Sequence, residues 1–186
     1  SDSIGIQNYL MRTYAKPSTY IAYGAHLMQE IQPELIAPYN LTPYQYNMLI
    51  ARLEPENSIE TILEGVTKSQ SPLPFLVIGN HLSKYGTYLK SKFKDSRIQF
   101  LGAIYDIDVL NNLRHFSNLY FHGHTVGGTN PSLLEAMASN CLICANDNEF
   151  NASILQTEGY YFKSSMDVSN LLDTVQKSEV EYAKIE

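Results

Sequence analysis

Short apolar runs alternate with longer amphipathic stretches along most of this 186-residue chain. Runs such as 75–78 (Phe-Leu-Val-Ile) are continuous, which is typical of parallel strands that are buried on both faces. Stretches such as 59–66 instead place apolar residues at helical spacing. Because the two patterns alternate, the sequence predicts an α/β fold, a doubly wound parallel sheet of Rossmann-like type, over residues 44–177. The predicted strands are 46–51, 75–78, 98–101, 119–121, 141–145 and 160–162, and the predicted helices are one capped by Ser58, then 83–93, 107–116, 131–139, 151–157 and 167–177.

The segments outside this region are too short to form a second domain. Residues 3–14 are predicted to be helical, and residues 19–23 are predicted to form a short strand. We therefore expect residues 1–28 to be the tail of a preceding domain. The proline-containing residues 29–43 are expected to be a linker, and residues 178–186 a C-terminal tail.

Charge and cysteine content narrow the class of protein. The formal net charge of -6 argues against a broad nucleic-acid surface. No apolar run approaches the ~20 residues that span a bilayer, and no signal-peptide pattern opens the chain.

Cys141 and Cys144 lie in a buried-strand pattern, where a spacing of three turns them to opposite faces. Two ligands are too few for a structural zinc site, so we expect reduced core thiols in a cytoplasmic protein.

One run, residues 121–145, is predicted to carry the binding site, because it reads as strand, glycine loop, helix and strand. Gly127 and Gly128 allow the backbone of the loop to approach a ligand closely. Asn130 is a good N-cap, and Pro131 suits the first helical position. The helix then opens with unpaired backbone N–H groups and a partial positive charge, which together predict an anion site.

Glu135 lies among the apolar residues of this predicted helix. The helix therefore has little polar surface, and Glu135 is expected to be at least partly buried. A partly buried carboxylate needs hydrogen-bond donors. A pair of sugar hydroxyls, beside a phosphate held at the start of the helix, would supply them. The alternative is that Glu135 faces solvent on a narrow polar stripe.

The carboxyl ends of the predicted strands bring further polar residues to one rim, where ligands bind in sheets of this kind. Glycine, arginine, histidine and asparagine converge there, as expected of a site for a phosphorylated small molecule. The stretches expected at this rim are 52–57, 79–81, 102–105, 122–130 and 146–148. They include the candidate site residues Arg52, Gly79, Gly102, His124, Gly127, Gly128, Thr129 and Asn130.

These residues resemble a known family. Gly-Thr-Asn-Pro-Ser-Leu-Leu-Glu-Ala-Met-Ala at 128–138 resembles the donor-binding signature of family-4 retaining glycosyltransferases of GT-B fold. Ala-Arg-Leu-Glu-Pro-Glu-Asn at 51–57 resembles their first phosphate-contacting loop, and Phe-Leu-Gly-Ala-Ile at 100–104 resembles the loop against the nucleobase. Asp-Ser-Ile-Gly-Ile-Gln at 2–7 and Tyr-Ile-Ala-Tyr-Gly-Ala at 20–25 look like the crossing out of the acceptor domain. The combination is similar to a bacterial, rhamnosyltransferase-like branch, with this chain as the C-terminal half.

The resemblance implies a role for each matching residue. Glu135 would bind the ribose hydroxyls, and the backbone N–H groups of Ser132 and Leu133 would hold the diphosphate. Arg52 would neutralise the diphosphate leaving group. Gly102 to Ile104 would line the base pocket, with Ile104 giving backbone contacts.

The chain departs from the family pattern at two positions. The family places a second Glu where this chain has Gly127, and a Lys where it has Asn57. Either His124, Thr129 or Asn130 takes over a donor contact, or the donor chemistry is impaired. For His124, a packing role within the loop is the alternative.

A metal-dependent reaction is the alternative suggested by Asp106-Ile-Asp108, because glycosyltransferases of the other major fold use an Asp-x-Asp pair. Asp106 directly precedes a predicted helix, however, and is better interpreted as its N-cap. No other His, Cys, Asp or Glu grouping has the spacing of metal ligands, so we expect no metal and no other cofactor.

The sequence thus predicts the donor-binding domain of a hexosyltransferase-type glycosyltransferase. It would use a nucleoside-diphosphate sugar for retaining, metal-independent transfer to a saccharide or lipid-linked acceptor in surface polysaccharide biosynthesis. The acceptor would bind an N-terminal domain, so this stretch alone is expected to bind the nucleotide without turnover. We expect a cytoplasmic location, peripheral to the inner face of the membrane in the full protein, with no nucleic-acid partner. The alternatives are a nucleotide-sugar epimerase on the same fold, and a degenerate, non-catalytic nucleotide-binding or assembly module.

Overall fold

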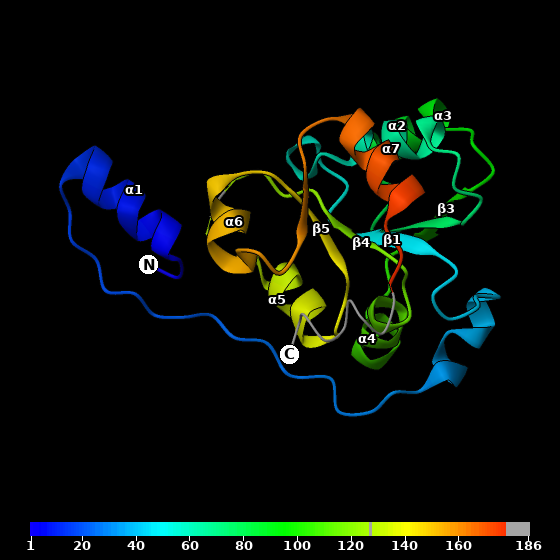
Figure 1. The fold of residues 1–186 in the computed structure, drawn as a ribbon, viewed down its shortest axis with the longest axis horizontal. Coiled ribbons are helices and arrows are strands. Elements are labelled where there is room, and N and C mark those ends of the chain that lie inside the picture. Colours follow the sequence, from blue (N-terminus) through cyan, green and yellow to red (C-terminus); the bar gives the residue numbers. More distant parts are fainter. Residues whose placement is uncertain (127, 178–186) are drawn as a thin grey trace.

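The computed structural model describes residues 1–126 and 128–177, and it contains one parallel sheet covered by helices on both faces (Figure 1). The strand order is β3-β2-β1-β4-β5-β6, and all neighbouring pairs are parallel. The strands are β1 (Asn47–Ile50), β2 (Phe75–Ile78), β3 (Ile98–Gly102), β4 (Tyr120–His122), β5 (Ile143–Asn146) and β6 (Tyr160–Phe162). The predicted doubly wound α/β fold is therefore confirmed.

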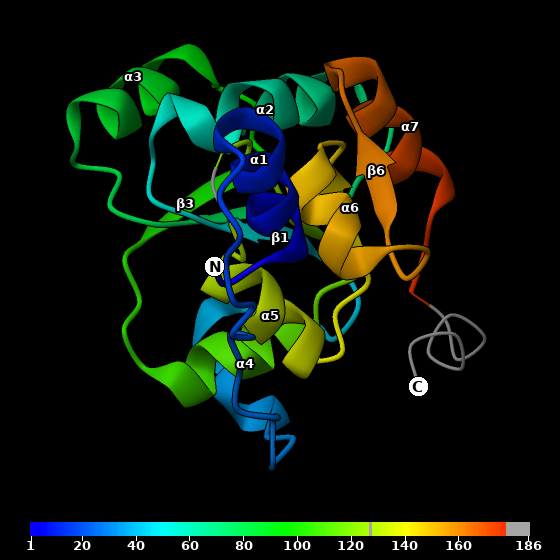
Figure 2. The same cartoon turned by 90° about the vertical axis from the view of Figure 1, so that its left-hand side faces the viewer.

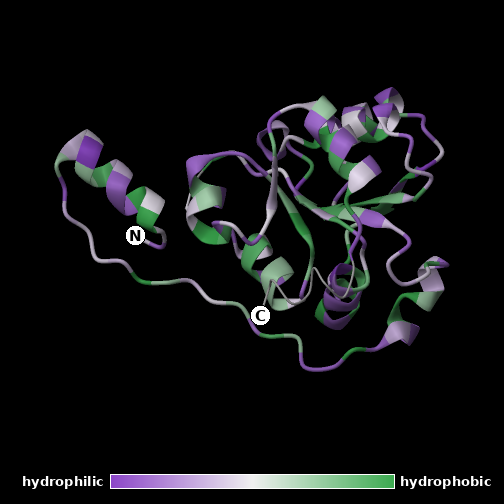
Figure 3. Cartoon of the chain, viewed as in Figure 1, coloured by the Kyte–Doolittle hydropathy of each residue, from purple (hydrophilic) through white to green (hydrophobic). Residues whose placement is uncertain are grey.

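The helices divide the apolar core into two layers, one on each face of the sheet. Buried side chains of α2, α3 and α7 pack on one face, and those of α4, α5 and α6 pack on the other. Figure 3 shows the apolar residues concentrated in the central strands and the inner helix faces. The α-helices are α1 (Ile4–Tyr14), α2 (Ile59–Lys68), α3 (Lys84–Lys92), α4 (Ile107–His115), α5 (Pro131–Ala138), α6 (Glu149–Leu155) and α7 (Ser165–Thr174).

Capping side chains fix where most helices begin. The carboxylate of Asp106 accepts hydrogen bonds from the backbone N–H groups of Asp108 and Val109, so its predicted role as the N-cap of α4 is confirmed. Asn130 caps α5 as predicted. Ser58 occupies the N-cap position of α2, but its backbone is left-handed and its side chain makes no capping bond.

The helix boundaries near the C-terminus differ from those predicted, because caps lie further upstream than the apolar spacing indicates. Asn148 caps α6, which spans Glu149–Leu155 rather than 151–157. Ser164 and Asp167 form a capping box, so α7 begins at Ser165. Conversely, β5 begins only at Ile143, two residues after the predicted start.

The N-terminal segment combines one confirmed element with one that was wrongly predicted. The helix α1 forms, capped by Ser3, and packs against α6 (Figure 2). Residues 15–32 have no regular structure, so the strand predicted at 19–23 does not form. Among the described residues no neighbouring strand pairs with this segment, and Ile21 is 72% exposed.

The predicted linker at 29–43 is more structured than expected. It holds two short 3-10 helices, Pro33–Leu35 and Ala37–Tyr39. The side chain of Ile36, between them, is buried in the same core layer as α4 and α5. This segment is therefore part of the packed domain.

The two cysteines are free and buried, as predicted. Cys144 belongs to the core layer of α2 and α7, and Cys141 belongs to the layer of α4 and α5. Burial raises the pKa of the Cys141 thiol to about 11, and it raises the pKa of the Cys144 thiol further. Both thiols are therefore uncharged at neutral pH.

Candidate functional site

A cavity of about 350 Å³ opens where the strand order reverses, between the carboxyl ends of β1 and β4 and the first turn of α5. This reversal point is where open α/β sheets bind their ligands. Here the chain continues from β1 to α2 on one face of the sheet and from β4 to α5 on the other. The residues that line the cavity are Ile50, Ala51, Arg52, Asn57, Leu110, Arg114, His122, Gly123, His124, Asn130, Pro131, Ser132 and Glu135.

The loops after β1 and β4 pack backbone against backbone beside this cavity. A Cβ atom on Gly123 would lie 2.0 Å from the carbonyl oxygen of Asn57, so only glycine fits there. Next to it, the backbone N–H of Thr125 donates to the carbonyl oxygen of Glu56 at 3.0 Å. The loop that carries the histidines is therefore held in place by the loop that carries Arg52.

His124 packs against neighbouring loops and also lines the cavity, so a donor contact by His124 stays a prediction. Its Nδ1 lies 3.0 Å from the amide oxygen of Asn57. Its carbonyl oxygen accepts bonds from the side-chain amides of Asn148 and Asn151. Burial, together with the nearby charge of Arg52, lowers the pKa of His124 below its usual value.

His122 lies in the stretch that was expected at the rim, but the sequence reasoning gave it no role of its own. It is only 4% exposed, and burial lowers its pKa to about 3, so the ring is neutral at pH 7. Its Nε2 has no hydrogen-bond partner among the described residues, although buried polar atoms are normally paired. The available signal was its place as the last residue of a strand, at the rim where ligands bind.

Glu135 is partly buried as predicted, but the donor that it needs comes from the protein itself. Its Oε2 accepts a hydrogen bond from Nη2 of Arg114 at 2.5 Å. The side chain of Arg114 is 1% exposed, whereas that of Glu135 is 38% exposed. The sequence reasoning missed Arg114, because a basic residue in the last turn of a helix usually faces solvent.

The first turn of α5 is already hydrogen-bonded in this structure. The N–H of Ser132 donates to the side-chain oxygen of Asn130 at 2.9 Å, and the N–H of Leu133 donates to the carbonyl oxygen of Asn130 at 3.0 Å. The Ser132 hydroxyl lies 3.0 Å from the phenol oxygen of Tyr120. A phosphate held by these two N–H groups would therefore have to displace Asn130.

Several residues predicted at the rim lie outside the 350 Å³ cavity. Gly79 and Gly102 are neighbours, with the N–H of Gly79 donating to the carbonyl oxygen of Gly102 at 2.9 Å. Ile104 packs against the core layer of α4 and α5. None of these three lines the cavity.

The glycine loop is the other predicted part that lies apart from the cavity. Thr129 donates its hydroxyl to the carbonyl oxygen of Asp2 at 2.7 Å, and a Cβ on Gly128 would meet the Asp2 carboxylate at 2.5 Å. Gly127 lies outside the described residues. The start of the chain is therefore seated against the loop that precedes α5.

The cavity carries a net positive charge. Its lining holds two arginines, Arg52 and Arg114, against the single carboxylate of Glu135, and both histidines are less basic than usual. The N-terminus of α5 adds a partial positive charge. The arrangement is suited to an anion that also offers hydroxyl groups to Glu135.

Two features are absent from residues 1–126 and 128–177. No three His, Cys, Asp or Glu side chains gather there into a group that could hold a metal ion. No helix there combines the length and the apolar character that crossing a bilayer requires.

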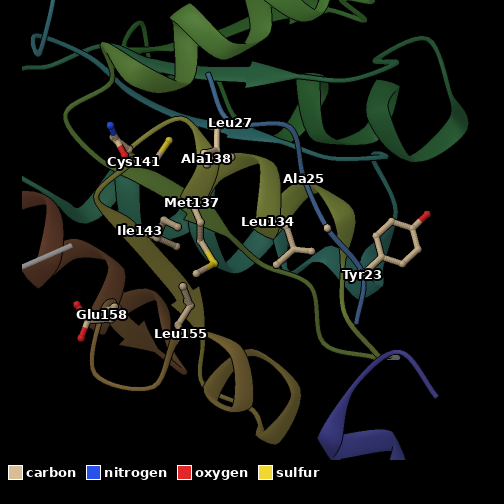
Figure 4. Close-up of a pocket in the computed structure, with 12 residues that line it drawn as sticks. Tyr23, Ala25, Leu27, Leu134, Met137, Ala138, Cys141, Ile143, Leu155 and Glu158 are labelled. Atoms are coloured by element: carbon tan, nitrogen blue, oxygen red, sulfur yellow. The ribbon is translucent and has the colours of Figure 1, made fainter. Parts of the chain in front are cut away.

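A second cavity, of about 430 Å³, lies at the other end of α5 (Figure 4). It is bordered by the extended residues 23–27 and by side chains such as Met137, Ile143 and Leu155. Met137 lies at the end of α5, Ile143 at the start of β5 and Leu155 at the end of α6, so the cavity is at the edge of the sheet opposite the carboxyl ends. Its lining is mostly apolar and lacks the arginine and histidine side chains of the first cavity.

Comparisons with known proteins give matches at the level of structure. No protein-family model and no curated protein matches the sequence. HepE from Anabaena, in complex with UDP-glucose, superposes with a TM-score of 0.77 at 16% identity, over 92% of this chain and 52% of that chain. Sucrose-phosphate synthase from Thermosynechococcus elongatus gives a TM-score of 0.71 at 18% identity, over 90% and 46% of the two chains. This chain therefore spans about half the length of these two structures.

A single-domain structure is also similar to this chain. The C-terminal domain of a glycosyl transferase group 1 family protein (LpcC) from Francisella tularensis gives a TM-score of 0.61 at 22% identity, over 88% of this chain and 89% of that chain. At such identities the likeness establishes the fold alone. The described residues form a Rossmann-like α/β domain of the kind found in GT-B glycosyltransferases.

Proposed function

We propose that this chain is the donor-binding domain of a glycosyltransferase and binds a nucleoside-diphosphate sugar in the cavity between β1, β4 and α5. The observation that carries the proposal is the composition of that cavity. It lies at the reversal of strand order, it is net positive, and it exposes the carboxylate of Glu135 next to the first turn of a helix. Structures of HepE with UDP and UDP-glucose, and of TarM from S. aureus with UDP, support the choice of ligand class.

The proposed roles follow from the chemistry of each group. Glu135 accepts hydrogen bonds from ribose hydroxyls, and Arg52 lies near the diphosphate. When the bond between the anomeric carbon and the phosphate oxygen breaks, its electron pair stays on the diphosphate, whose growing charge is stabilised by fixed cations and helix N–H groups. Ser132 and Leu133 would provide those N–H groups after Asn130 is displaced. Transfer would retain the anomeric configuration and need no metal.

The remaining assignments concern the base, the acceptor and the cellular role. Gly79, Gly102 and Ile104 would border the base, and the glycine loop with Thr129 would approach the donor sugar. The acceptor, a saccharide or a lipid-linked saccharide of surface polysaccharide synthesis in the bacterial cytoplasm, would bind another domain. This chain alone would then bind the nucleotide without transfer.

Titration calorimetry with UDP, GDP, dTDP and ADP, in EDTA and then in magnesium, tests the proposal. Saturable binding of one nucleotide in EDTA is expected, and Glu135→Gln should weaken it. Glu158→Gln is the matched control, because Glu158 borders the second cavity and should leave the affinity unchanged. Binding only with magnesium would contradict metal independence, and no binding to any of the four would contradict the donor-site assignment.

A second candidate is a nucleotide-sugar epimerase, which would use the same cavity. Incubating the chain with the UDP-sugar, GDP-sugar or dTDP-sugar of the nucleotide that binds separates the two. Isomer or free sugar formed without an acceptor would favour the epimerase. A third candidate, a non-catalytic module, is favoured by Asn57 and Gly127 standing where the resemblance places Lys and Glu.

A further inference from the structure

Arg114 is the largest fully buried side chain of the protein's described residues, and it lines the proposed nucleotide cavity. A guanidinium group removed from water is strongly unfavourable unless its charge and its N–H groups find partners. An apolar side chain of similar volume would fill the same space without that penalty. The presence of a buried cation beside the cavity therefore calls for an explanation.

The contacts of Arg114 hold it rigidly between α4 and α5. Nη1 donates to the side-chain oxygen of Asn111 at 3.1 Å, and Nη2 donates to Oε2 of Glu135 at 2.5 Å. Its carbonyl oxygen accepts the hydroxyl of Ser117 at 2.7 Å and the thiol of Cys141 at 3.3 Å. Both the backbone and the guanidinium plane of Arg114 are therefore fixed.

The partner of this fixed cation reaches the cavity. Glu135 is 38% exposed, and its Oε1 has no hydrogen-bond partner in residues 1–126 or 128–177. An ionised carboxylate can accept about four hydrogen bonds, so the contact with Arg114 leaves most of its capacity for a ligand. A buried cation behind an accessible carboxylate is the arrangement expected when one residue orients another.

We propose that Arg114 is a positioning residue: it holds Glu135 in place as the acceptor for ligand hydroxyl groups. This inference rests on the proposed nucleotide-binding function and extends it to a residue on a different helix. Because the guanidinium is planar and bonds Asn111 and Glu135 at once, a lysine cannot reproduce both contacts.

The test is a double-mutant cycle on binding, measured by calorimetry with the nucleoside diphosphate that binds in the panel above and with its nucleoside. The variants are Arg114→Met, Glu135→Gln and the double variant, with Arg114→Lys as a second replacement that keeps the charge. Arg97→Met is the matched control, because Arg97 also pairs with a carboxylate, that of Asp95 at 2.7 Å, but does not line the cavity. Thermal unfolding of every variant identifies any that fail to fold.

We expect Arg114→Met and Glu135→Gln each to weaken binding of both ligands by roughly 10- to 100-fold, as is usual for hydrogen bonds to charged groups. The double variant should bind no worse than the weaker single variant, because Arg114 acts through Glu135. Arg114→Lys should fall between the wild type and Arg114→Met, and Arg97→Met should bind normally.

Unchanged affinity in folded Arg114→Met or Arg114→Lys would overturn the inference while leaving the proposed function standing. Losses that multiply in the double variant would also overturn it, since they would mean that Arg114 acts independently of Glu135. If the wild type binds no nucleotide of the panel, the proposed function itself is contradicted. That outcome can be distinguished from the two results above, which overturn only the role of Arg114.

Discussion

Removing Glu135 should destabilise the protein more than removing Arg114, although the two side chains belong to one ion pair. The prediction follows from their unequal burial, 38% exposed for Glu135 against 1% for Arg114. Glu135→Ala leaves a charged guanidinium in the interior with only the uncharged side chains of Asn111 and Tyr120 beside it among the described residues. Arg114→Met leaves a carboxylate that water can already reach.

These exposures determine how much unfolding free energy each variant is expected to lose. Breaking a buried ion pair by deleting one partner costs about 3–5 kcal/mol of unfolding free energy. Because more than a third of Glu135 is exposed, water enters the vacated space, and we reduce the expected loss to about 2 kcal/mol for Glu135→Ala. For Arg114→Met, whose remaining partner is hydrated, we expect about 1 kcal/mol or less.

Urea unfolding followed by circular dichroism measures both values. Thermal midpoints should fall in the same order, by about 4–8 °C for Glu135→Ala at ~2–4 °C per kcal/mol. A loss for Glu135→Ala that is equal to or smaller than the loss for Arg114→Met would refute the reasoning from burial.

The pair of Asp95 and Arg97 provides the control, with the opposite order expected. Their side chains are similarly exposed, 17% and 21%, but Arg97 also donates to the backbone carbonyl oxygens of Val66, Ser69 and Ser71. Arg97→Met should therefore cost more than Asp95→Ala in the same unfolding experiment.

Three further predictions concern the loop after β4 and the core. Gly123→Ala should lower both stability and nucleotide affinity, because its Cβ would meet the carbonyl oxygen of Asn57 at 2.0 Å; wild-type values in unfolding and calorimetry would contradict this. The pKa of His122 is about 3 when folded and near 6.5 when unfolded, so the unfolded state binds one more proton between these values and stability falls as the pH falls. Between pH 6.5 and pH 5, the wild type should lose about 1–2 kcal/mol more unfolding free energy than His122→Gln. Urea titrations that give the wild type and His122→Gln the same dependence on pH would contradict a buried neutral ring. Cys141 and Cys144 should resist iodoacetamide until urea unfolds the chain, because both are buried and uncharged. Mass spectrometry measures the rate of alkylation, and equal rates for native and unfolded protein would contradict this prediction.

The fold was largely predictable because the strands of a parallel sheet have a simple sequence pattern. A strand that is buried on both faces must be continuously apolar, so 75–78 was located without error. The edge strand 160–162 was located as well, because its three residues are all aromatic although two of them are only partly buried. The strand predicted at 19–23 failed because its apolar residues carry no information about whether a neighbouring strand exists. Boundaries near 149 and 165 shifted because a capping side chain, rather than the last apolar residue, decides where a helix begins.

The site was predictable only where function leaves a local pattern. Asn130 and Glu135 both line the cavity and are close together in the sequence, so their proximity could be predicted directly. Gly128 and Thr129 were predicted beside them but lie against Asp2 instead. The pairing of Glu135 with Arg114 joins two helices separated by a strand, and no spacing rule indicates it. His122 was given no role for a related reason: a histidine at a strand end looks the same whether its ring is paired or unpaired.

The seating of the N-terminal helix has a consequence for local dynamics. No residue of α1 is buried, and the residues that follow it, 15–32, have no regular structure. Its attachment consists mainly of contacts with α6 and of Asp2 against Gly128 and Thr129. Amide hydrogens of α1 should therefore exchange through a local opening of lower free energy than global unfolding. Each such opening would also free Gly128 and Thr129 from Asp2, so exchange rates in α1 would report on how often these two residues can rearrange around a ligand.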